Sequence, residues 1–179
     1  MSIVKGLVFF VLLSVVSFGI STRASAQARP SPATQVASID PIPLLYDGAL
    51  MLQYEYKAGP VYSWMFRVDY WSNPDPTGQW SAFGFGAAYR VYIADSRALT
   101  GLSVAPVADI FFARQTIDGS SQRSAICFDI GGDLAYKWIF DDFSVEPIFG
   151  LRIGFGPNVA PTRATGFEPL IGVSGGYAW

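Results

Sequence analysis

Residues 143–155, F-S-V-E-P-I-F-G-L-R-I-G-F, decide the fold class of this chain. Its odd positions, from Phe143 to Phe155, are all large or apolar, whereas its even positions are mostly small, polar or charged. Successive side chains of a β-strand point to opposite faces, so this alternation predicts a strand with one apolar face. At about 3.3 Å per residue it extends roughly 40 Å, longer than the roughly 9–11 tilted residues with which a strand crosses a bilayer. Lipid would not tolerate Glu146 and Arg152 on the even face, but a barrel interior would.

The same alternation recurs along the chain and predicts eight strands. They are expected at residues 36–45, 48–57, 60–71, 79–93, 100–115, 122–140, 142–156 and 164–179. The breaks alternate between tight ones, at 57–60, 94–99 and 141–142, and longer polar ones, at 72–78, 116–121 and 157–163. Tight turns at one end and longer loops at the other are typical of outer-membrane barrels. The pattern therefore predicts an all-β, antiparallel, up-and-down transmembrane β-barrel with the tight turns on the periplasmic side.

The first strand carries the weakest pattern, because Pro41 and Pro43 cannot donate to a sheet ladder. It is retained because single-chain bacterial barrels have an even number of strands, and the other segments number seven. The alternative is one long strand from Val36 to Lys57, bent at Asp47-Gly48.

The N-terminal segment predicts export. Lys5 precedes an apolar run from Gly6 to Ile20, and Ala24 and Ala26 occupy the small-residue positions of an A-x-A cleavage site. This layout is typical of a secretory signal peptide at residues 1–26, followed by a flexible leader at 27–35 and the barrel at 36–179. The alternative is an N-terminal membrane anchor, for which the apolar run is short.

The charge balance excludes nucleic acid as a partner. Removing residues 1–26 removes Lys5 and Arg23 and leaves ten basic and 14 acidic residues, a net charge of −4. Nucleic-acid-binding domains instead carry a basic patch or stripe.

The predicted inward faces collect charges of both signs. They are Glu55, Arg67, Asp69, Arg90, Asp109, Asp129, Asp133, Lys137, Glu146, Arg152 and Glu168, seven acids and four bases, with Gln53 beside them. An eight-stranded barrel is just wide enough to be filled by side chains, and isolated buried charges are too costly. We expect an interior network of ion pairs and water; the alternative is a narrow, slightly cation-preferring path.

Aromatic residues gather near one end of the strands. The predicted periplasmic aromatic girdle is Tyr54, Tyr56, Tyr89, Tyr136, Trp138, Tyr177 and Trp179. Tyr and Trp favour membrane interfaces because each ring combines an apolar body with a polar group. The alternative is that these residues form the core of a β-sandwich.

The last strand alternates Ile171, Val173, Gly175 and Tyr177 and closes on Trp179. This ending resembles the signal by which the outer-membrane assembly machinery recognises unfolded barrels. The mature chain as a whole resembles the small eight-stranded outer-membrane barrels of the OmpA and OmpX type, and Leu52-Gln53-Tyr54-Glu55-Tyr56 is similar to a group of bacterial barrels of unknown function. The resemblance implies the assembly machinery and outer-membrane lipid as partners, and the second likeness carries no known activity.

Three arginines, Arg114, Arg123 and Arg163, fall near the end with the longer predicted loops. The planar guanidinium suits phosphate, so these residues are candidates for contact with lipopolysaccharide; the alternative is that they are simply solvated.

The sequence predicts neither catalysis nor a cofactor or metal site. The chain has no histidine, the commonest base for serine or cysteine nucleophiles and the commonest metal ligand. The single cysteine, Cys127, is expected to be a packing residue, and Asp129 with Asp133 is the first carboxylate pair to test for acid–base chemistry.

We therefore expect a non-enzymatic outer-membrane barrel with a structural or interaction role. One alternative is a small pore for ions or small solutes. The other is a soluble lipocalin-like barrel with its aromatics inside and its charges outside.

Overall fold

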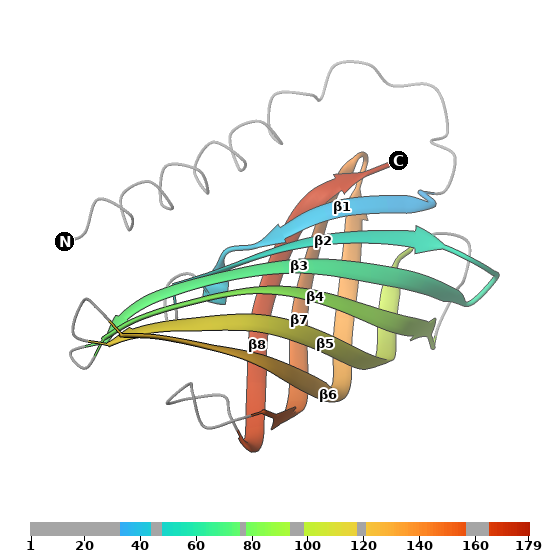
Figure 1. Cartoon of the computed structure of the whole chain (residues 1–179). Coiled ribbons are helices and arrows are strands. Elements are labelled where there is room, and N and C mark those ends of the chain that lie inside the picture. The colour runs from blue at the N-terminus through green and yellow to red at the C-terminus, as the bar shows by residue number, and fades with distance from the viewer. Residues whose placement is uncertain (1–32, 44–47, 76–77, 94–98, 118–120, 157–164) are drawn as a thin grey trace. The chain divides into compact units, whose positions relative to one another are not determined.

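The computed structural model describes residues 33–43, 48–75, 78–93, 99–117, 121–156 and 165–179. These residues form a closed antiparallel barrel in which each strand pairs with the next and β1 pairs with β8 (Figure 1). Its strands are β1 (Gln35–Asp40), β2 (Ala49–Lys57), β3 (Tyr62–Asp75), β4 (Gly78–Tyr92), β5 (Gly101–Ile117), β6 (Ser121–Phe140), β7 (Phe143–Phe155) and β8 (Thr165–Ala178). The prediction of an all-β, eight-stranded, up-and-down barrel is confirmed. No helix among the described residues is long and apolar enough to cross a membrane.

The first strand is present but shorter than predicted. β1 pairs with β2 from Gln35↔Tyr56 to Asp40↔Met51 and ends just before Pro41, so the alternative of one bent strand from Val36 to Lys57 is wrong. Proline explains the early end, because it cannot donate to the ladder. The predicted strand end at residues 44–45 lies outside the described residues.

Two of the three longer loops expected from the sequence contain strand residues, at 72–75 and 78 and at 116–117 and 121. The pairing of β3 with β4 continues to Asp75↔Gly78, and that of β5 with β6 continues to Ile117↔Ser121. The predictions of loops at 72–78 and 116–121 are therefore wrong in length. Polar and turn-forming residues suggested loops there, but a hairpin can be closed by as few as two residues, and backbone pairing does not require apolar side chains. The predicted loop at 157–163 lies outside the described residues.

The first and last described residues of the chain meet at one end of the barrel, which we call the terminal end. The backbone amides of Thr34 and Gln35 donate to the Trp179 carbonyl at 2.8 and 2.9 Å, and the Trp179 amide donates to the Gln35 carbonyl at 3.0 Å. Residues 33–35, predicted to belong to the leader, are thus tied to the barrel. Inside this end lies an apolar cluster of Ala33, Val36, Tyr92, Leu99 and Ala178.

The two faces of the strands differ in polarity, and β7 shows the difference clearly. Its even positions from Ser144 to Arg152 are buried, with Glu146 only 1% and Arg152 5% exposed. Its odd positions face outward, with Phe149 48% and Ile153 43% exposed. The alternation in residues 143–155 therefore places apolar side chains on the outer wall and charged ones in the interior.

Candidate functional site

The barrel interior holds most of the charged residues predicted to face inward. Ten of the eleven are buried, namely Glu55, Arg67, Asp69, Arg90, Asp109, Asp129, Asp133, Lys137, Glu146 and Arg152. The eleventh, Glu168, is half-buried on β8, opposite Arg152 in the β7–β8 register. Eight of the buried residues form two ion-pair clusters, one above the other along the strands.

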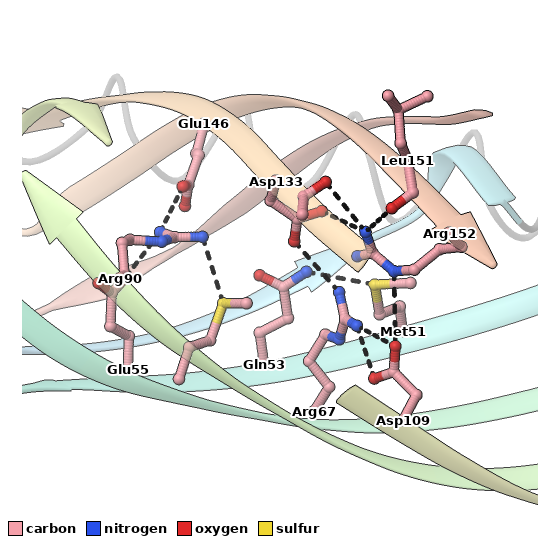
Figure 2. Close-up of polar contacts among 12 residues, drawn as sticks. Met51, Gln53, Glu55, Arg67, Arg90, Asp109, Asp133, Glu146, Leu151 and Arg152 are labelled. Atoms are coloured by element: carbon pink, nitrogen blue, oxygen red, sulfur yellow. Dashed lines mark hydrogen bonds and ion pairs between the residues drawn. The ribbon is translucent and has the colours of Figure 1, made fainter. Parts of the chain in front are cut away.

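The first cluster, which we call the terminal cluster, consists of Glu55, Arg90, Lys137 and Glu146 near the terminal end. Arg90 Nη1 lies 2.9 Å from Glu55 Oε2 and 2.5 Å from Glu146 Oε1 (Figure 2). Lys137 Nζ pairs with Glu55 Oε2 and lies 3.2 Å from Glu146 Oε2. Each base thus contacts both acids, and the two charges of each sign balance.

The terminal cluster spans the interior. Glu55 lies on β2 and Lys137 on β6, which are four strands apart in a closed ring of eight. The two residues therefore project from opposite walls and meet inside. Arg90 on β4 and Glu146 on β7 make a second contact over three strands. All four side chains are only 1–2% exposed, so little solvent reaches them.

Two hydroxyl groups complete the terminal cluster, and both donate to Glu55 Oε1. Tyr92 Oη lies 2.7 Å from this oxygen, and Ser63 Oγ makes the second bond. Sequence analysis assigned neither residue to the network. The alternation puts both on the inner face, since Tyr92 follows Arg90 by two positions and Ser63 precedes Arg67 by four, but their approach to Glu55 depends on the strand register.

The second cluster, the central cluster, consists of Arg67, Asp109, Asp133 and Arg152. Arg67 Nη2 donates to both Asp109 carboxylate oxygens at 2.6 Å, and Arg152 Nη1 lies 2.6 Å from Asp133 Oδ1 (Figure 2). Two longer contacts of 3.5 Å, Arg67–Asp133 and Arg152–Asp109, close a ring of alternating charge. The four residues come from β3, β5, β6 and β7, so this ring also bridges separate walls.

Glycines make room for the short aspartates of the central cluster. An added Cβ at Gly86 would overlap Asp109 Oδ1, and one at Gly150 would overlap Asp133 Oδ1. Gly86 also pairs with Arg67 on one side and Asp109 on the other in the strand registers. These inward glycines thus position the carboxylates by leaving space.

Asp40 at the end of β1 is a further buried acid that sequence analysis did not assign to the interior. Its Oδ1 accepts hydrogen bonds from the Ile42 amide at 3.0 Å and the Val173 amide at 3.3 Å. Its side chain lies over Gly172, where an added Cβ would overlap Oδ2. Asp40 therefore caps the end of β1 and ties it to β8.

An apolar layer lies beyond the central cluster, away from the terminal end. Phe111 and Trp71 stack with ring centroids 4.9 Å apart, and Phe111 packs with Ala125 and Cys127. Cys127 is buried beside Phe111 and Ala125, and Asp133 lies within ion-pair distance of both Arg67 and Arg152. In the described part of the chain, no group of three or more potential ligands is arranged to hold a metal ion.

The predicted aromatic girdle lies on the outer wall near the terminal end. Tyr54, Tyr136, Trp138, Tyr177 and Trp179 are 39–57% exposed, whereas Tyr56 and Tyr89 are half-buried. Rings contact one another along a strand, with Tyr177–Trp179 at 5.7 Å and Tyr136–Trp138 at 4.7 Å, and across strands, with Tyr54–Trp179 at 6.4 Å.

Trp64 extends this belt and was missing from the predicted set. Its ring lies 5.1 Å from that of Tyr89, with which it pairs in the β3–β4 register. The alternation in β3 placed Trp64 on the outer face, but not at the height of Tyr89, because height depends on register.

The predicted arginine group is divided by the structure. Arg114 and Arg123 are both exposed on the adjacent strands β5 and β6. Arg114 shares the outer face with Phe112, whereas Arg123 lies on the face of the buried Ala125 and Cys127. Arg163 lies outside the described residues.

No protein-family model, no curated protein and no solved structure matches this chain. Its class is therefore defined by its own geometry. It is a closed eight-stranded antiparallel barrel with an apolar outer wall and an ion-paired interior.

Proposed function

We propose that this protein is a non-enzymatic integral barrel of the bacterial outer membrane, of the OmpA and OmpX type, with a structural or interaction role. The observation that supports it is the distribution of polarity. Among the described residues, 27 large hydrophobic side chains are exposed, whereas ten charged side chains of the interior set are buried. Soluble monomers rarely expose contiguous apolar patches larger than a few hundred Å². An apolar outer wall around a polar interior suits a barrel surrounded by lipid.

The height of the apolar wall supports the same proposal. On β6, the outward positions from Ile126 to Phe140 carry apolar or small side chains, apart from the tyrosine hydroxyl of Tyr136, and the next outward residue is Ser124. Twelve residues separate Ser124 from Tyr136 of the aromatic girdle, roughly 40 Å along the strand. At a strand tilt of about 40°, this spans roughly 30 Å, the thickness of a bilayer's hydrocarbon core.

The interior favours a closed barrel over a pore. Glu55 and Lys137 meet from opposite walls, and the central cluster forms a second layer of ion pairs. A permeating ion would have to separate these buried pairs, which is costly. The soluble lipocalin-like alternative requires aromatics inside and charges outside, the reverse of the observed faces.

The proposed location implies two partners, the outer-membrane assembly machinery and outer-membrane lipid. The signal peptide would direct export, the alternating last strand would engage the assembly machinery, and the outer wall would contact outer-membrane lipid. In the two clusters every acid lies within ion-pair distance of a base, which supports a structural rather than a catalytic role for these eight residues.

Fractionation of a Gram-negative host that expresses the full-length chain tests the proposal. We expect the mature protein in the outer-membrane fraction, extracted only by detergent and migrating differently on a gel before and after heating. Recovery from the periplasm in a detergent-free, soluble form would contradict the proposal.

A further inference from the structure

We propose that a hollow on the outer wall of β3–β6 binds one molecule of lipopolysaccharide, with a lipid phosphate on the guanidinium of Arg114. This inference rests on the proposed outer-membrane location and names one lipid and its site.

The outer wall changes from apolar to polar along two neighbouring rows of the sheet. In the strand registers, Tyr70, Phe83, Phe112 and Ile126 form one row across β3–β6. The next row on the same face lies two positions away on each strand, on the side away from the terminal end. It consists of Ser72, Ser81, Arg114 and Ser124. A polar row directly beside an apolar row is the profile of a lipid headgroup above its acyl chains.

A hollow of about 460 Å³ lies at this boundary. Tyr70, Phe83, Phe112 and Ile126 line its apolar side, and Ser81, Arg114 and Ser124 line its polar side. Ala82, Ala113 and Ala125 also border it, but their Cβ atoms are buried inside the barrel, so their backbone forms the floor. The apolar side chains are 41–50% exposed and present a surface for an acyl chain.

The positive charge of Arg114 at the hollow favours an anionic ligand. Arg114 is exposed, and no carboxylate of the described residues lies within ion-pair distance of it. Ser81 and Ser124 pair with Arg114 from either side and offer two hydroxyl groups at its level. A planar guanidinium flanked by hydroxyls matches a phosphate group, which accepts several charge-assisted hydrogen bonds.

The position of Arg114 along the barrel axis indicates in which leaflet the bound lipid would lie. Arg114 pairs with Ser124, roughly 30 Å above the girdle residue Tyr136 at a strand tilt of about 40°. Arg114 therefore lies at the headgroup level opposite the girdle. With the girdle periplasmic, this is the outer leaflet, where the phosphorylated lipid is lipopolysaccharide.

Native mass spectrometry of the detergent-solubilised mature protein tests the inference, with lipid A as the probe. We expect wild type to retain one lipid A, and Arg114→Gln to weaken this binding at least about tenfold, as expected for a lost charge-assisted bond of roughly 1.4 kcal/mol or more. The matched control Arg123→Gln removes an arginine from the neighbouring strand on the opposite face, and should bind as wild type does.

Two comparison lipids test whether the site recognises the phosphate groups of lipid A. Lipid A without its phosphates should bind no better to wild type than to Arg114→Gln. Equal binding of lipid A by wild type and Arg114→Gln, or equal binding of phosphatidylglycerol and lipid A by wild type, would overturn the assignment. Heat-modifiable migration of every variant separates the two proposals: a heat-modifiable membrane protein that binds no lipid A refutes the site but not the barrel's location.

Discussion

The terminal and central clusters each bury two acids and two bases, but different features of the chain stabilise them. The terminal cluster uses long side chains that meet from opposite walls, with hydroxyls of Ser63 and Tyr92 completing Glu55. The central cluster uses short aspartates, and glycines leave the space that the carboxylates occupy. We infer that the terminal cluster depends on its charges and hydroxyls, whereas the central cluster depends on the absence of side chains at Gly86 and Gly150.

The largest effect is expected from Glu55→Gln, which removes one of the two acids that Arg90 and Lys137 both contact. Two buried bases would then share one carboxylate, and breaking a buried pair in this way costs about 3–5 kcal/mol. Urea-induced unfolding in detergent or vesicles measures the loss. Glu168→Gln, at a half-buried position on β8, is the control and should cost clearly less.

The double variant Glu55→Gln with Lys137→Met sharpens this test. It removes one charge of each sign, so it should be more stable than Glu55→Gln alone. If the two variants unfold at the same denaturant concentration, charge balance is not what stabilises the terminal cluster.

Gly86→Ala should disturb the central cluster without changing any charge. The added methyl group would overlap Asp109 Oδ1 and push this carboxylate away from Arg67, and overpacking of this kind costs about 1–3 kcal/mol. Gly166→Ala on β8 is the matched control, since nothing lies within 4 Å of its added Cβ. Equal stability of the two variants would show that the space at Gly86 is not required.

Of the single substitutions Glu55→Gln, Gly86→Ala and Tyr92→Phe, the last should have the smallest effect. It removes one neutral donor to Glu55 but leaves Ser63, Arg90 and Lys137 in place. The expected cost is about 1.5 kcal/mol in the free energy of unfolding, the lower end for a hydrogen bond to a charged group, because Ser63 still donates to the same oxygen. Tyr136→Phe, on the exposed outer wall, should cost less. A loss for Tyr92→Phe as large as for Glu55→Gln would mean that the hydroxyl, and not the charge, organises the cluster.

The alternation of residue types predicted the strands and their faces because side-chain direction along a strand depends only on position parity. It could not predict which charges meet, since the contact of Glu55 with Lys137 joins strands that never pair and depends on closure of the ring. The grouping of Arg114 with Arg123 has a different cause: both lie near the same ends of neighbouring strands, but the alternation itself puts them on opposite faces. Loop lengths were overestimated at 72–78 because polar residues there remain paired.

Site-directed spin labelling of β7 in lipid vesicles tests the central claim, an apolar wall in lipid around a buried polar interior, most directly. Single cysteines would replace Phe149, Leu151 and Ile153 on the outer wall and Ile148 in the interior, in a Cys127→Ser background. We predict high accessibility of the three odd positions to oxygen dissolved in lipid and low accessibility to a water-soluble paramagnetic reagent, with position 148 shielded from both. Odd positions that are accessible to the water-soluble reagent would contradict the account.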